Sequence, residues 1–115
     1  MISPNEIKNR ALSFSKEWLL ETREDAEAKT FWDDFFEVFG VTRRRVASFE
    51  HPIKKLDNSQ GYADLLWKGV LLVEHKSAGK DLDTAYQQAK DYFPGLKDEE
   101  LPRYIIVSDF ANFRV

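Results

Sequence analysis

A pair of apolar stretches that carry charged residues constrains this sequence more than any other feature. Tyr62 to Trp67 and Val70 to Lys76 predict two strands of a hairpin, because both are short, apolar and separated by a tight turn. Asp64 lies inside the first strand, and Glu74 and Lys76 end the second. Burying such groups is costly unless they are paired, hydrogen-bonded or bound to a metal ion. The hairpin therefore predicts a polar site at the edge of a core.

The geometry of the hairpin decides whether the charged residues meet. Glu74 and Lys76 are two residues apart on one strand, so their side chains leave the same face. Asp64 joins that face only if the loop has an odd number of residues, such as Trp67-Lys68-Gly69, or if a bulge intervenes. With a two-residue turn at Lys68-Gly69, Asp64 would point to the other face. An odd-length loop is thus a structural requirement of a shared site.

Two carboxylates on one face form an oxygen-ligand site for a hard cation such as Mg²⁺, which keeps several waters. The backbone carbonyl of His75, between Glu74 and Lys76, is a candidate further ligand. Such an ion polarises a phosphodiester and lowers the pKa of a bound water, which Lys76 would orient or help to deprotonate. The plainer alternative is an ordinary ion pair of Lys76 with Asp64 or Glu74. The pattern alone leaves both open.

The remaining sequence predicts an α/β (α+β) fold in which a mixed central sheet of about four strands is flanked by helices. The predicted elements are a helix from Pro4 to about Thr22, a second helix that ends at Gly40, a strand from Val41 to Glu50 that Pro52 interrupts, a helix capped by Asp81, and a strand from Arg103 to Ser108. Phe31, Phe35 and Phe39 recur at helical spacing, which favours a core role over a base-stacking platform. A length of 115 residues argues for a single domain, 1–115.

The helix after Asp81 adds two candidate residues. Gln88 and Tyr92 are four residues apart and share one helix face, directly after the strand that ends at Lys76. A glutamine there is placed to hold an attacking water or a phosphate oxygen, and a solvated helix glutamine is the alternative. We therefore include Gln88 among the candidate catalytic residues.

These motifs resemble a known family. The stretches that carry the resemblance are Gly61-Tyr62-Ala63-Asp64, Glu74-His75-Lys76-Ser77-Ala78-Gly79-Lys80-Asp81-Leu82, Thr30-Phe31-Trp32, Phe35-Phe36-Glu37-Val38-Phe39-Gly40, Gln88-Ala89-Lys90-Asp91-Tyr92-Phe93 and Ser108-Asp109-Phe110. They are similar to the PD-(D/E)XK nuclease superfamily, and over nearly the whole chain to the N-terminal endonuclease domain of MmeI-type (type IIG/IIL) restriction–methylation enzymes. The resemblance implies a restriction-endonuclease-like three-layer fold and Mg²⁺-dependent hydrolysis of DNA that leaves 5′-phosphates, with Mn²⁺ able to substitute.

The resemblance also implies roles for individual residues. Asp64 and Glu74 match the metal-binding acids, Lys76 matches the catalytic lysine, and Gln88 with Tyr92 matches a helix motif of some members. Glu27 matches an acid of the first helix that binds metal through water. Ala63 stands where the superfamily has its proline, a position at which many members differ. The sequence carries no methyltransferase motif, so methyltransferase and target-recognition regions are expected in a longer protein of which this is the N-terminal fragment.

Charge and composition limit the kinds of partner and location that the sequence predicts. The net charge is −3, from 17 basic and 20 acidic residues, whereas DNA-binding proteins usually carry a basic excess. The local basic clusters are Arg43-Arg44-Arg45 and Lys54-Lys55, for which phosphate contact and a solvated sheet edge are the two alternatives. The candidate DNA contacts are Arg43, Arg45, Lys80 and Tyr92. No apolar run has the length of a membrane helix, no signal peptide opens the chain and cysteine is absent, so a cytoplasmic location is expected.

Three functions remain open from the sequence. The preferred hypothesis is a Mg²⁺-dependent endonuclease domain of a restriction–modification protein that acts on double-stranded DNA, with a homodimer as one route to double-strand cleavage. A repair or junction-resolving nuclease is the first alternative, and the acidic net charge argues mildly against it. The second is a docking module that keeps the fold without cleaving.

Overall fold

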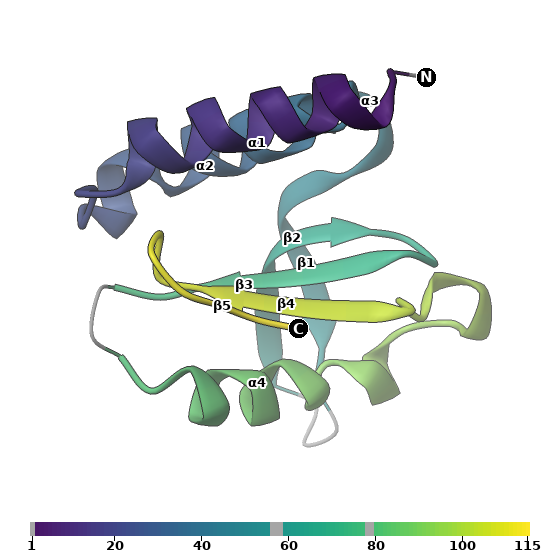
Figure 1. Ribbon diagram of the computed structural model, residues 1–115. Coiled ribbons are helices and arrows are strands. Elements are labelled where there is room, and N and C mark those ends of the chain that lie inside the picture. Colours follow the sequence, from purple (N-terminus) through teal and green to yellow (C-terminus); the bar gives the residue numbers. More distant parts are fainter. Residues whose placement is uncertain (1, 56–58, 78–79) are drawn as a thin grey trace.

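A three-layer arrangement organises the molecule (Figure 1). The computed structural model describes residues 2–55, 59–77 and 80–115. Helices α1 (Pro4–Trp18) and α2 (Glu24–Val38) cover one face of a central sheet, and α4 (Leu82–Lys90) covers the other. The predicted α+β class with a mixed sheet between helices is confirmed. Ala78 and Gly79, which form part of the sequence resemblance, lie outside the described residues.

The sheet has five strands where the sequence predicted about four. They are β1 (Ser48–Lys54), β2 (Gln60–Trp67), β3 (Leu71–His75), β4 (Tyr104–Ser108) and β5 (Phe113–Arg114), in the spatial order β1-β2-β3-β4-β5. Only β3 and β4 pair in parallel, since α4 forms the crossover between them. The two residues of β5 are too few to show a strand pattern in the sequence.

The predicted strand from Val41 to Glu50 is wrong in its first half. Helix α3 (Arg43–Val46) occupies that part, and β1 starts only at Ser48. The Arg43 side chain explains the difference, because its Nε donates to Asp33 at 2.6 Å and its Nη1 donates to the Ala47 carbonyl at 3.0 Å. Tertiary contacts of this kind override a local strand preference.

Pro52 lies within β1 and does not interrupt it, contrary to the prediction. It pairs with Tyr62 of β2, while the other side of β1 is the edge of the sheet. A proline lacks the backbone N–H that a central strand needs on both sides, but an edge strand tolerates it. The same edge position accommodates Glu50, whose φ of 49° departs from the strand conformation.

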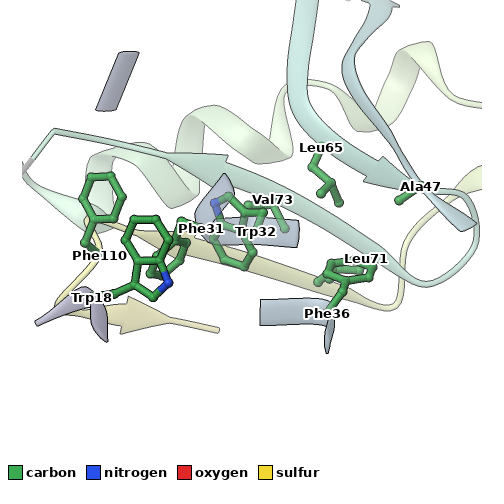
Figure 2. Close-up of a cluster of buried hydrophobic side chains, with 9 residues drawn as sticks. All are labelled: Trp18, Phe31, Trp32, Phe36, Ala47, Leu65, Leu71, Val73 and Phe110. Atoms are coloured by element: carbon green, nitrogen blue, oxygen red, sulfur yellow. The ribbon is translucent and has the colours of Figure 1, made fainter. Parts of the chain in front are cut away.

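Two apolar clusters, one on each face of the sheet, hold the layers together. Alternating residues of the strands divide between them: Leu65 and Val73 face α1 and α2, whereas Leu66 and Leu72 face α4. Aromatic rings dominate the first cluster (Figure 2), and Phe31 is completely buried at its centre. The core role predicted from helical spacing is thus confirmed for Phe31 and, in part, for Phe35, which is partly buried against the cluster, but it is wrong for Phe39, which is 46% exposed just after the end of α2.

Two short 3-10 helices, η1 (Phe93–Gly95) and η2 (Asp98–Glu100), connect α4 to β4. A search of the described residues found no helix with the length and apolar character that crossing a membrane requires.

Replacing Phe31 with alanine tests the aromatic cluster. Its ring contacts those of Phe14, Trp18 and Phe110, so Phe31→Ala removes buried area and leaves a cavity. We expect a loss of about 3–5 kcal/mol in the free energy of unfolding, measured by urea denaturation. Phe39→Ala is the matched control, because Phe39 follows the same helix but is 46% exposed. Equal losses for the two variants would contradict this assignment of the core.

Candidate active site

A three-residue loop closes the β2–β3 hairpin. Trp67 pairs with Leu71, so Lys68, Gly69 and Val70 form the turn. Gly69 adopts a φ of 78°, a conformation that glycine reaches without the steric cost of a Cβ. The loop length is therefore odd, as a shared site requires, although its residues are 68–70 and not the suggested 67–69.

The hairpin register brings the two acids together at the end of the ladder. The last paired residues are Leu65 and Val73, and the same register places Asp64 opposite Glu74. Beyond that point β2 stays paired with β1, and β3 stays paired with β4 up to His75. An Asp64 side-chain oxygen, Oδ2, takes the place of a ladder partner and accepts the His75 backbone N–H at 2.7 Å.

Glu74 is the most perturbed acid of the site. It is only 5% exposed, and its Oε1 has no hydrogen-bond partner among the described residues. Burial raises the pKa of the Glu74 carboxyl to about 9. The negative charge of Asp64 and a side-chain hydrogen bond with Asp64 also raise this pKa, whereas the Lys76 ammonium lowers it. The Lys76 ammonium thus offsets the burial only in part, and the carboxyl keeps its proton near neutral pH.

Lys76 and Tyr92 complete the surroundings of Glu74. The Lys76 backbone N–H donates to the Ser108 carbonyl at 2.8 Å, which fixes the segment that leaves β3. The Tyr92 hydroxyl donates to the Tyr62 carbonyl at 3.0 Å. Burial raises the pKa of Tyr92 to about 12, and the charge of Glu74 acts in the same direction. Tyr92 therefore stays a neutral phenol beside the acids.

The His75 ring faces away from the acids and anchors β3 to α2. Trp32 donates its indole N–H to His75 Nδ1 at 2.9 Å, and the Phe110 ring lies 4.3 Å away between centroids. The ring is 2% exposed, and burial lowers the pKa of His75 to about 4, against the opposing charge of Asp109. The ring thus belongs to the aromatic cluster, whereas a metal-ligand role of the His75 carbonyl stays a prediction.

Gln88 and Lys80 lie with Lys76 around a pocket of about 400 Å³. This pocket also contains Glu24, an acid that the sequence analysis missed. Glu24 accepts the Ser77 hydroxyl at 2.9 Å and also lines a second pocket, which contains Asp64. Its position at the first turn of α2 gave no signal in the sequence, since the contact with Ser77 spans 53 residues.

The other predicted residues lie apart from this group. Glu27 forms an ion pair with Arg23 at 3.6 Å, so its water-mediated metal role stays a prediction. Arg43 is engaged by Asp33 and packs over the Phe49 ring at 4.0 Å. Arg45 is exposed on α3. The DNA contacts predicted for these two arginines are not tested by the structure.

The donor set suits a hard cation with few protein ligands. The described residues contain no group of three or more histidine, cysteine or acidic side chains that could hold a metal ion. Mg²⁺ often uses only one or two carboxylates and keeps waters for its other positions. The orphaned Oε1 of Glu74, next to the Asp64 carboxylate, therefore fits such an ion.

Comparison with protein families identifies the domain type. Residues 9–115 match the family described as MmeI, N-terminal domain. The chain belongs to this family. Searches among curated proteins and among solved structures each found no match. Within this MmeI N-terminal domain, the matched span includes both pockets and all of the acids described above.

The raised pKa of Glu74 predicts that stability falls as pH rises. In the folded state Glu74 keeps its proton up to about pH 9, whereas the unfolded carboxyl ionises near its ordinary pKa of 4.5. Between these values the unfolded state binds fewer protons, so the free energy of unfolding decreases, by at most about 1.4 kcal/mol per pH unit. Glu74→Gln should flatten this dependence in metal-free urea denaturation.

The control for this experiment is Glu99→Gln, which changes an exposed carboxyl of η2. It should keep the wild-type dependence. A Glu74→Gln protein whose stability declines between about pH 5 and about pH 8 as steeply as the wild type would contradict the assignment.

Proposed function

We propose that this domain is a metal-dependent endonuclease of the PD-(D/E)XK type that hydrolyses phosphodiester bonds of double-stranded DNA within a restriction–modification enzyme. The observation that carries the proposal is the Glu74 carboxyl, buried beside Asp64 with an oxygen that has no partner among the described residues. Natural proteins keep such a group where a ligand compensates it. A divalent cation does so directly.

Asp64 and Glu74 would hold Mg²⁺, or Mn²⁺ in its place, with the His75 carbonyl as a further donor. When bound, the cation supplies positive charge to phosphodiester oxygens and lowers the pKa of water. The protein contributes preorganisation: the His75 N–H fixes the Asp64 carboxylate, and Trp32 fixes His75. These contacts set the positions of both acids before substrate arrives.

Lys76 contributes the positively charged side chain of the proposed site. Its ammonium lowers the pKa of Glu74, which means that it lies close to the carboxyl groups. In that position it donates hydrogen bonds to the nucleophilic water or to a phosphate oxygen as negative charge develops there. Gln88, on the wall of the same pocket as Lys76, assists by holding the water or the phosphate.

Membership of the MmeI N-terminal domain family supports the restriction context. The family is the one that the motifs around Asp64 and Glu74 resemble, and that resemblance implies DNA cleavage together with methyltransferase and target-recognition regions. The net charge of −3 is consistent with such a division of labour, because much of the grip on DNA would come from those other regions.

Metal binding gives a direct test that does not depend on cleavage. At about tenfold its Kd, Mg²⁺ should stabilise the wild-type protein by about 1.4 kcal/mol, which raises Tm by roughly 5 °C. Asp64→Asn and Glu74→Gln should lose this shift, measured by differential scanning fluorimetry at about pH 8. The Glu99→Gln variant and an NaCl solution of equal ionic strength serve as controls. Equal shifts in all variants would refute the metal site.

Cleavage tests the function itself. With Mg²⁺ and supercoiled or linear DNA, we expect the wild-type protein to cut and Asp64→Asn, Glu74→Gln and Lys76→Met to be slower by about a hundredfold or more. Gel electrophoresis of the products gives the rates. Lys8→Met, on the exposed face of α1, should cut like the wild type.

The product pattern separates the alternatives. Discrete fragments support a restriction enzyme, and unspecific nicking that the same substitutions abolish supports a general nuclease. If the full-length protein that contains this domain is folded and leaves DNA intact over a range of Mg²⁺ and Mn²⁺ concentrations, the nuclease proposal fails and the docking module remains.

A further inference from the structure

Lys55 occupies an unusual position beside the acids. It directly follows β1, and its backbone N–H donates to the Ser59 carbonyl at 2.9 Å. A Cβ on Gly61 would come within 2.8 Å of Lys55 Cε and within 2.7 Å of Tyr92 Cε1. The lysine stem and the tyrosine ring therefore lie together over Gly61, and the absence of a side chain there makes room for both.

The ammonium of Lys55 is held near the site without neutralising it. It lies 5.7 Å from the centre of the Tyr92 ring, and the charge of Glu74 influences that tyrosine. Lys76 is among the groups that set the pKa of Glu74, but Lys55 is not. Within the described residues Lys55 also forms no ion pair. Its charge is thus available to a ligand beside the tyrosine ring.

We propose that Lys55 binds a backbone phosphate of the DNA substrate, at a subsite beside the Tyr92 ring. The inference rests on the proposed nuclease function and names a substrate contact of the same site. A lysine contacts phosphate as a compact charge and is indifferent to base identity. Lys55 therefore contributes to affinity and to the position of the strand, and leaves sequence preference unchanged.

A cation at the position of Lys55 would offset the repulsion between the acids and the DNA. The acidic side chains of Asp64 and Glu74 repel DNA, and the phosphates of a DNA strand that enters the site must pass close to them. A cation fixed by packing pays less conformational entropy on binding than a freely rotating surface lysine. Gly61 is the residue that permits this packing, which ties the glycine of the Gly61-Tyr62-Ala63-Asp64 motif to substrate binding.

Lys55→Met tests the proposal, because methionine keeps an apolar stem over Gly61 and removes the charge. Lys54→Met is the matched control: Lys54 is exposed, and adjacent strand residues point to opposite faces. Binding of a fluorescein-labelled duplex of mixed sequence is measured by anisotropy over a range of salt concentrations. Ca²⁺ replaces Mg²⁺, and gels of the same samples verify that the duplex stays intact.

For Lys55→Met we expect weaker binding, and a slope of log K against log salt that is smaller in magnitude by about 1 than the wild-type slope. For Lys54→Met we expect the wild-type slope. An unchanged slope for Lys55→Met, equal losses in both variants or no binding by the wild type at low salt would overturn the proposal. Cleavage by the wild type is scored separately. Cleavage with an unchanged Lys55→Met slope refutes only this subsite, whereas a changed slope without cleavage refutes only the nuclease function.

Discussion

The hydrogen bond from the His75 backbone N–H to the Asp64 carboxylate is the contact on which the site depends. It lies just beyond the Leu65–Val73 pair, where the β2–β3 ladder ends, and joins residues one and two positions past that pair. In a continuous ladder a backbone carbonyl would take that N–H, and the strands would leave little room for two carboxyl groups. A side chain that caps the ladder satisfies the buried donor and aims Asp64 at Glu74. One interaction thus ends the sheet locally and forms the acidic pair.

The last two residues of β3, Glu74 and His75, point to opposite faces of the sheet. Glu74 points toward α4, where Tyr92 limits its exposure, whereas His75 points toward α2 and accepts the indole N–H of Trp32. Because alternation along a strand is strict, a shift of one residue in the register would move the histidine into the acidic site and the glutamate into the aromatic cluster. The aromatic core therefore fixes the position of the site as well as the stability of the fold.

The sequence predicted the parts of this structure that follow from local periodicity. Alternation placed Asp64, Glu74 and the hairpin, and helical spacing placed Phe31 in the core. The predicted strand near Arg43 failed because its side chain bonds to Asp33 of another helix. Glu24 was missed for a related reason: its partner, Ser77, lies 53 residues away, and no local pattern reports such a contact. The metal and catalytic roles are chemical predictions, which the fold supports only through proximity.

The distribution of charge would allow an acidic chain to host the proposed phosphate-binding site. The net charge of −3 describes the whole molecule, but a phosphate responds mainly to charges within about 10 Å, the Debye length near physiological salt. Lys76 and Lys80 line one pocket with Gln88, and the Lys55 ammonium lies 5.7 Å from the centre of the Tyr92 ring. The local charge in this region is therefore more positive than the net charge of the chain suggests. In the proposed function, these lysines would hold the phosphates of a DNA strand that the acids alone would repel.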